Sequence, residues 1–90
     1  MYRKKNIRML RIELDKHGRK GKAATLITDF QGEDTELERI QKSLQKSLGT
    51  GGSRCWNSAE PFDGQILLQG DVRLKAKAWL EKEGYKVRVI

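Results

Sequence analysis

The sequence is poor in cysteine, in histidine and in chemistry-bearing clusters, and each shortage removes a class of protein. A single cysteine, Cys55, excludes an internal disulfide and argues against a cysteine-based metal site; we expect it to pack as a small hydrophobe. The one histidine, His17, stands among cations, and no nucleophile–base pair, carboxylate pair or metal-ligand spacing can be isolated. We therefore expect no catalysis, no metal and no cofactor.

Long apolar runs are also missing. No stretch approaches the about 20 residues that a membrane-spanning helix needs, and the basic N-terminus is not followed by the apolar region of a signal peptide. We therefore expect a cytoplasmic protein without a membrane partner. The chain has 90 residues, of which 37% are hydrophobic, and shows no repeat or low-complexity linker. We expect a monomer with a short basic lead-in, residues 1–9, and one small domain, residues 10–90.

What the sequence does contain is positive charge confined to one part of the chain. Residues 1–22 carry nine lysines or arginines against two acids, whereas residues 23–90 carry ten of each, so the net charge of +7 lies wholly in the first stretch. Such asymmetry indicates a nucleic-acid binder. An anionic membrane surface is the alternative partner, but no basic amphipathic helix supports membrane binding.

The charge is densest between two predicted strands. Residues 7–15 alternate apolar and polar side chains and residues 23–30 are rich in β-formers, which together predict a hairpin with a long tip. Glycine permits positive φ in such a tip, and its closely spaced cations repel one another, so we expect the tip to meet an anion such as a phosphate backbone. The RNA-binding candidates in this loop are Lys16, Arg19, Lys20 and Lys22.

A first helix is predicted to open at Asp34-Thr35. Thr35 and Glu38 fit a capping box, and Gly49 stands where a helix ends with positive φ. The apolar stripe comprises Leu37, Ile40, Leu44 and Leu48. The glycine-rich residues 49–53 follow a helix rather than precede one, so they meet its negative end and are not interpreted as a phosphate loop.

The second half of the chain predicts further strands and one more helix. Strands are expected at 53–60, 65–69 and 86–90, and a helix begins at Asp71 as N-cap, carries Trp79 on its apolar face and ends at Gly84. The predicted order is ββαββα plus a C-terminal β. The simplest fold is α+β: a two-layer sandwich in which both helices cover one face of a mostly antiparallel sheet.

Several short motifs occur in a fixed order along this pattern. They are Gly18-Arg19-Lys20-Gly21-Lys22, Leu26-Ile27-Thr28, Gly49-Thr50-Gly51-Gly52, Gln69-Gly70-Asp71 with Arg73, and Gly84. In this combination the chain resembles the translation initiation factor one family, in its bacterial and archaeal-type branch, over residues 10–90.

The resemblance implies a function and a set of contacts. A member binds the small ribosomal subunit near the P site and helps initiator tRNA and start-codon selection, with other initiation factors as further partners. It implies RNA contacts for the loop tip and for the first helix, and it places a corner of the chain on the tRNA side. On this chain the helix residues are Arg39, Lys42 and Lys46, and the corner is Gln69, Gly70 and Asp71.

Other interpretations remain beside this one. Arg39, Lys42 and Lys46 also fit a solvent-exposed helix face with a Glu38–Lys42 pair. Trp56 can pack on the sheet, which we favour, or stack on a base. The function alternatives are a non-specific single-strand nucleic-acid binder, a stress-related translation repressor, and a protein-interaction module around the Trp56 hairpin.

Overall fold

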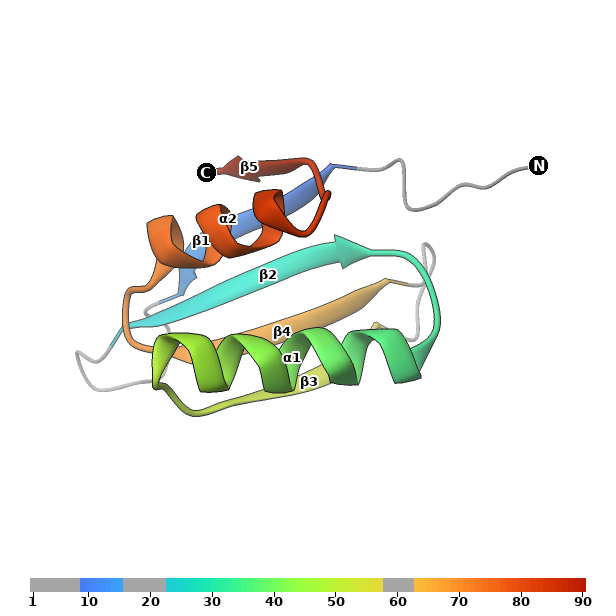
Figure 1. Ribbon diagram of the computed structural model, residues 1–90, viewed down its shortest axis with the longest axis horizontal. Coiled ribbons are helices and arrows are strands. Elements are labelled where there is room, and N and C mark those ends of the chain that lie inside the picture. The colour runs from blue at the N-terminus through green and yellow to red at the C-terminus, as the bar shows by residue number, and fades with distance from the viewer. Residues whose placement is uncertain (1–8, 16–22, 58–62) are drawn as a thin grey trace.

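The chain forms one five-stranded sheet and two helices. The computed structural model describes residues 9–15, 23–57 and 63–90. The elements are β1 (Leu10–Asp15), β2 (Ala24–Phe30), α1 (Asp34–Leu48), β3 (Gly52–Trp56), β4 (Gly64–Gln69), α2 (Arg73–Lys82) and β5 (Val87–Val89), shown in Figure 1. This order confirms the predicted ββαββα arrangement with a final strand.

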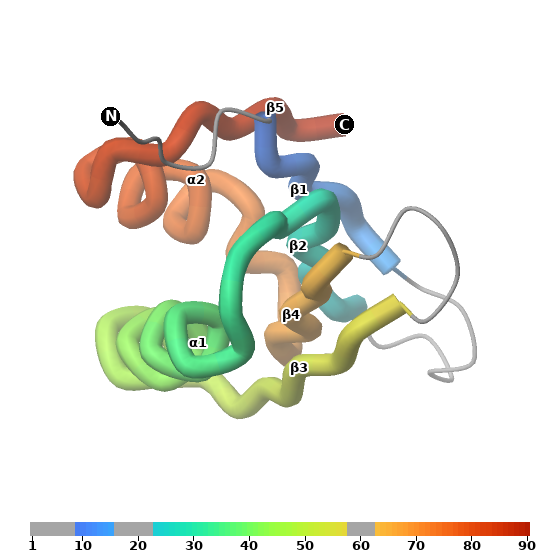
Figure 2. Tube along the Cα trace, turned by 90° about the vertical axis from the view of Figure 1, so that its right-hand side faces the viewer, coloured from blue at the N-terminus to red at the C-terminus, as the bar shows by residue number. Residues whose placement is uncertain are grey.

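The strands lie in the order β3-β4-β2-β1-β5. Neighbours pair antiparallel except β1 and β5, which are parallel because the chain crosses over through α2 before it enters β5. Both helices lie on the same face of the sheet, as Figure 2 shows end-on. The predicted fold class, a two-layer α+β sandwich with a mostly antiparallel sheet, is confirmed.

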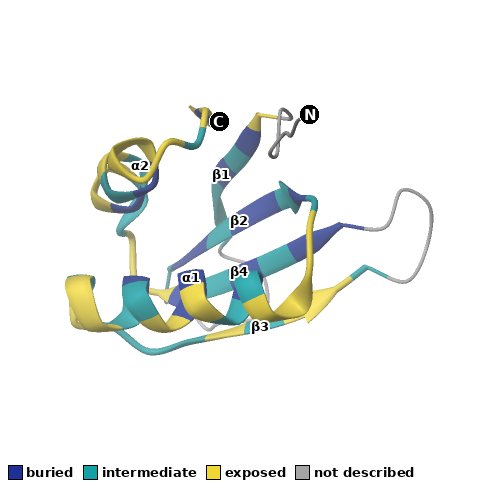
Figure 3. Cartoon of the chain, turned by 45° about the vertical axis from the view of Figure 1, so that its right-hand side comes forward, coloured by how far each residue is buried: buried dark blue, intermediate teal, exposed yellow. Residues whose placement is uncertain are grey.

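The core fills the space between the sheet and the helices. Alternate residues of β1, β2 and β4 point to the helices, and the stripe predicted on α1 points back at them; Figure 3 shows the buried residues along this layer. The fully buried side chains include Leu10, Ile12, Phe30, Leu37, Ile40, Leu44, Ile66, Leu68 and Leu80. Trp79, predicted in the core, packs against it but is only partly buried.

A bulge near the end of β2 turns Phe30 into this core. Asp29 has φ 72°, and the β2–β4 register shifts between Ile27 and Phe30. The Asp29 N–H, which the bulge removes from the ladder, donates to Oδ2 of buried Asp63 at 3.0 Å. Phe30 then meets Trp56 edge to face, with ring centroids 6.1 Å apart. Trp56 thus packs on Phe30, while it remains 36% exposed.

The predicted capping box of α1 is wrong, although the helix starts where it was predicted. No Thr35 cap forms: the helix begins at Asp34, and the N-cap position is Glu33, whose side chain makes no capping bond among the residues described. Asp34 instead accepts from Arg54 Nε at 2.9 Å and from Trp56 Nε1 at 2.6 Å. Contacts with β3, 20 positions away in sequence, thus outweighed the local capping pattern.

Cys55 also departs from expectation. Its side chain is exposed on β3, on the face of the sheet away from the helices. The neighbouring Arg54 and Trp56 point toward α1, so the alternation of the strand turns Cys55 outward. The prediction that a lone cysteine packs inside fails because edge strand β3 has one face without a covering layer.

Candidate nucleic-acid interface

The basic loop predicted to bind RNA joins β1 to β2. Lys16, Arg19, Lys20 and Lys22 lie outside the described residues, but both flanks are placed: Asp15 pairs with Ala24 across the two strands. The carbonyl of Ala23 accepts from the Gly70 N–H at 2.9 Å. The base of the loop therefore touches the corner that was predicted to face tRNA.

That corner, Gln69–Asp71, is shaped by one buried hydroxyl. Thr25 on β2 is fully buried, and its Oγ1 donates to the Gly70 carbonyl at 2.8 Å while accepting from the Val72 N–H at 2.8 Å. Gly70 has φ 85°, a conformation that favours glycine. Thr25 therefore sets the path from β4 into α2, a role that the sequence pattern did not reveal because a threonine in a strand is unremarkable.

Asp71 was predicted to cap α2, and this prediction is wrong. The N-cap position is Val72, and the helix starts at Arg73. The Asp71 carboxylate accepts from Arg73 Nε at 2.8 Å and Nη2 at 2.9 Å, while its contact with the Arg73 N–H is long, at 3.4 Å. This bidentate pair raises the pKa of Arg73, and both of its hydrogen bonds are shorter than the contact of the carboxylate with the Arg73 N–H.

The glycine-rich segment after α1 lies against the same corner. Thr50 Oγ1 donates to the Gln69 carbonyl at 2.7 Å, and the Gln69 N–H donates to the Gly51 carbonyl at 2.9 Å. Gly49, with φ 65°, ends α1 as predicted. A Cβ on Gly52 would stand 2.6 Å from the Leu67 carbonyl oxygen, so close packing requires glycine there. These glycines serve a turn and a strand contact, consistent with rejecting a phosphate loop.

The α1 cations form an exposed stripe. Arg39, Lys42 and Lys46 are all exposed, and their spacing places them along one side of the helix. Lys42 pairs with Glu38 at 3.3 Å, but its side chain is 70% exposed, so a phosphate can compete for it. Lys46 lies in the last turn, where the negative helix end favours a cation.

Side chains of Arg54 and Tyr85 fix α1 on the rest of the domain. Arg54 binds Asp34, and its Nη1 donates to Gln41 at 3.0 Å; the Tyr85 hydroxyl donates to Glu36. Hydrogen bonds from Arg54 and then Trp56 lower the pKa of Asp34 to about 2. Burial, followed by the Glu36 hydrogen bond, raises the pKa of Tyr85. The side of α1 that carries the cations is thus held away from the sheet.

The structure brings these parts together at one end of the molecule. Figure 1 shows the start of β2, the end of β4, the start of α2 and the end of α1 at the left. The base of the basic loop, the Gln69–Asp71 corner and the Gly49–Gly52 segment meet there through the hydrogen bonds above. Lys46 comes three positions before Gly49, whereas Arg39 and Lys42 lie further back along α1.

Neither a cluster of metal ligands nor a membrane-spanning helix is found among the described residues. Within residues 9–15, 23–57 and 63–90, no three histidine, cysteine or acidic side chains gather as metal ligands. Of the helices described, neither has the length and apolar character needed to cross a bilayer.

Two helices on one face of a five-stranded sheet, with a cationic stripe on the first helix, define a small α+β domain whose chemistry lies on its surface. The chain belongs to the family described as Translation initiation factor SUI1, which matches residues 6–86. The resemblance read from the sequence motifs is therefore confirmed.

Individual relatives agree with this assignment. The chain is 38% identical over 81 residues to the uncharacterized protein YciH of Escherichia coli, covering 90% of this chain and 68% of that protein. It is 37% identical over 87 residues to the protein translation factor SUI1 homolog of Picrophilus torridus, covering 96% and 80%. The homolog from Sulfurisphaera tokodaii is 36% identical, with 90% and 73% covered.

Proposed function

We propose that this protein is a translation initiation factor that binds the RNA of the small ribosomal subunit and influences initiator tRNA and start-codon selection. It acts by binding, without catalysing a reaction. The observation that carries the proposal is the meeting of the loop base, the Gln69–Asp71 corner and the end of α1 at one end of the molecule. Four of the nine cations of residues 1–22, those between β1 and β2, adjoin that end in sequence.

The physical basis is phosphate neutralisation from two surfaces. The loop cations Lys16, Arg19, Lys20 and Lys22 supply the first surface, and Arg39, Lys42 and Lys46 on α1 supply the second. Contacts of this kind release counterions from RNA and are independent of sequence. Specificity for one site therefore requires that both surfaces fit RNA strands held at a fixed separation, as they are in a folded ribosomal RNA.

The corner is proposed to face tRNA. Gln69, Gly70 and Asp71 are exposed, while the backbone beneath them is fixed by Thr25 and by Thr50. A rigid backbone beside a basic loop can set how closely a second RNA approaches. This supports an influence on initiator tRNA placement through shape and charge rather than through a reaction.

Co-sedimentation with isolated small ribosomal subunits tests the proposal. We expect saturable one-to-one binding that survives a moderate excess of polyanion competitor. Lys42→Ala with Lys46→Ala should weaken it, whereas the matched pair Lys77→Ala with Lys82→Ala, on α2, should not. Binding that competitor abolishes completely would instead identify a non-specific single-strand nucleic-acid binder, which the concentrated charge of residues 1–22 also favours.

A further inference from the structure

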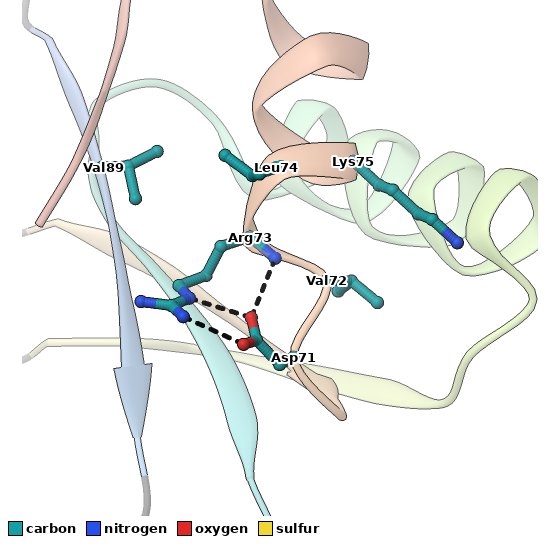
Figure 4. A pocket seen from close by; sticks show the side chains of 6 residues that line it. All are labelled: Asp71, Val72, Arg73, Leu74, Lys75 and Val89. Carbon is teal, nitrogen blue, oxygen red and sulfur yellow. Dashed lines mark hydrogen bonds and ion pairs between the residues drawn. The ribbon is translucent and has the colours of Figure 1, made fainter.

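A second surface lies at the edge of the sheet opposite β3, between β5 and the first turn of α2. The hollow there has a volume of about 390 Å³. We call it the β5 groove; it is lined by Asp71, Val72, Arg73, Leu74, Lys75 and Val89, drawn in Figure 4. The proposed ribosomal contacts use Asp71 at its rim but none of its other lining residues.

An apolar side chain is unusually accessible at this groove. Leu74, which lines it, is 75% exposed. Val72 and Val89, which also line it, are partly buried. An exposed leucine beside two partly buried valines in a hollow offers an apolar contact that another molecule can cover.

The backbone of β5 adds a second feature. Toward β1, the Lys86 carbonyl accepts from the Leu10 N–H at 2.8 Å and the Ile90 N–H donates to the Ile12 carbonyl at 2.7 Å. In a strand the residues alternate, so Val87 and Val89 direct their N–H and C=O groups away from β1. These groups lie at the edge of the sheet and have no partner in the part of the chain that the structure describes.

The charge around the groove is positive. Asp71, Arg73 and Lys75 line it, and because Asp71 is paired with Arg73, the charge of Lys75 is in excess among these three. On β5 itself Lys86 and Arg88 are exposed. An incoming chain with negative side chains is therefore favoured.

We propose that the β5 groove binds an extended acidic segment of a partner protein, which adds to the sheet as a strand beside β5. Its backbone pairs with the outward groups of Val87 and Val89. Because side chains alternate in a strand, those that face the helix layer are apolar and cover Leu74. Those on the other face are acidic and meet Arg88. The partner sequence therefore alternates apolar and acidic residues.

These features of the β5 groove favour a protein segment over RNA as its occupant. Phosphate groups would engage Lys75 but would leave the exposed side chain of Leu74 in water. The opposite sheet edge offers no equivalent site, because its helix-facing residues Arg54 and Trp56 are already bound to Asp34. The combination of apolar exposure, an unpaired strand edge and positive charge is specific to the β5 side among the described residues.

The probe is a short capped peptide that alternates valine and glutamate, titrated into the isotope-labelled protein and followed by NMR. We expect saturable shifts at Leu74 and Val89. Hydrogen exchange of the Val87 and Val89 amides should slow by at least tenfold, while that of the Ile90 amide, already bonded to Ile12, should not change. A peptide that alternates valine and lysine is the control and should bind at least tenfold more weakly.

Three variants sharpen the test. Leu74→Asp and Lys75→Glu should each weaken binding of the acidic peptide at least tenfold, whereas Lys82→Glu, in the last turn of the same helix, should leave it within twofold. Val89→Pro removes an N–H that makes no bond to β1 and should abolish binding. If Val89→Pro does not fold, Leu74→Asp and Lys75→Glu still test whether the peptide binds at the groove.

Several outcomes would overturn the proposal. One is equal binding of the acidic and basic peptides, and another is peptide binding that Lys75→Glu leaves intact. A third is unchanged exchange of the Val87 and Val89 amides at saturation. Shifts of the groove residues caused by an RNA oligonucleotide, and not by the acidic peptide, would assign this surface to RNA instead.

Discussion

Arg54 on β3 holds the Asp34 carboxylate at the start of α1 through two hydrogen bonds, from Nε at 2.9 Å and from Nη2 at 3.0 Å. This fork joins an edge strand to a helix that lies far away in sequence. Trp56 Nε1 donates to the same carboxylate, so a single acid receives both side chains that β3 turns toward the helix layer. The start of α1 is therefore set by this contact rather than by a helix cap.

The first prediction concerns the titration of Asp34. Its folded pKa is about 2, below the ordinary 3.8, so its contribution to stability is present above pH 3.8 and is lost as the pH falls through about 2. An NMR titration of the Asp34 carboxyl should show this low midpoint. Arg54→Met should move it back toward 3.8, and Trp56→Phe should move it less, because Arg54 is the stronger cause. An unshifted midpoint in the Arg54 variant would contradict the fork.

The second prediction tests the hydroxyl that shapes the corner. Thr25→Val keeps the shape of the side chain but leaves the Gly70 carbonyl and the Val72 N–H without their partner. We expect the free energy of unfolding to fall by about 1–3 kcal/mol. Thr28→Val is the matched control: its buried Oγ1 has no hydrogen-bond partner among the described residues, so the substitution should be neutral or stabilising. Denaturant unfolding measures both, and equal losses would refute the assignment.

The third prediction compares two leucines of α2. Leu80 is fully buried, so Leu80→Ala should cost about 2–5 kcal/mol of unfolding free energy. Leu74 is exposed, so Leu74→Ala should change stability by no more than about 0.5 kcal/mol. Thermal melts of the two variants check the register of the helix. A large loss for Leu74→Ala would place that side chain in the core and would remove the basis of the β5 groove.

The fourth prediction concerns the salt dependence of RNA binding. Each phosphate contact contributes roughly 0.7–0.9 to the log–log slope of affinity against salt. Arg19→Ala with Lys20→Ala should therefore lower the slope by about 1.5 if both touch phosphate, while the melting temperature changes little because charged loop residues contribute little stability.

Two further double substitutions serve as comparisons for that prediction. Lys42→Ala with Lys46→Ala should flatten the slope similarly if α1 also faces RNA, and should leave it unaltered if α1 is a solvent face. Lys77→Ala with Lys82→Ala, on the other helix, should leave it unaltered in either case. A slope that Arg19→Ala with Lys20→Ala does not change would remove the central role of the loop.

The sequence by itself determined the order of the elements, the fold class and the family. Periodicity is a local property, so the buried stripe of Leu37, Ile40 and Leu44 on α1 was predictable from spacing alone. The same holds for Gly49, because a helix end at this position requires a residue that tolerates positive φ. The charge of residues 1–22 was likewise readable without any structure.

The tertiary structure alone decided how polar side chains are used. Thr35 and Asp71 have the residue types of helix caps, yet neither caps a helix, because the α1 start is tied to Arg54 and the α2 start to Thr25. Cys55 is exposed because it lies on the uncovered face of β3. Such partners are distant in sequence and come together only when strands pair. The open edge of β5 is also decided this way, since only the pairing order shows which strand is last.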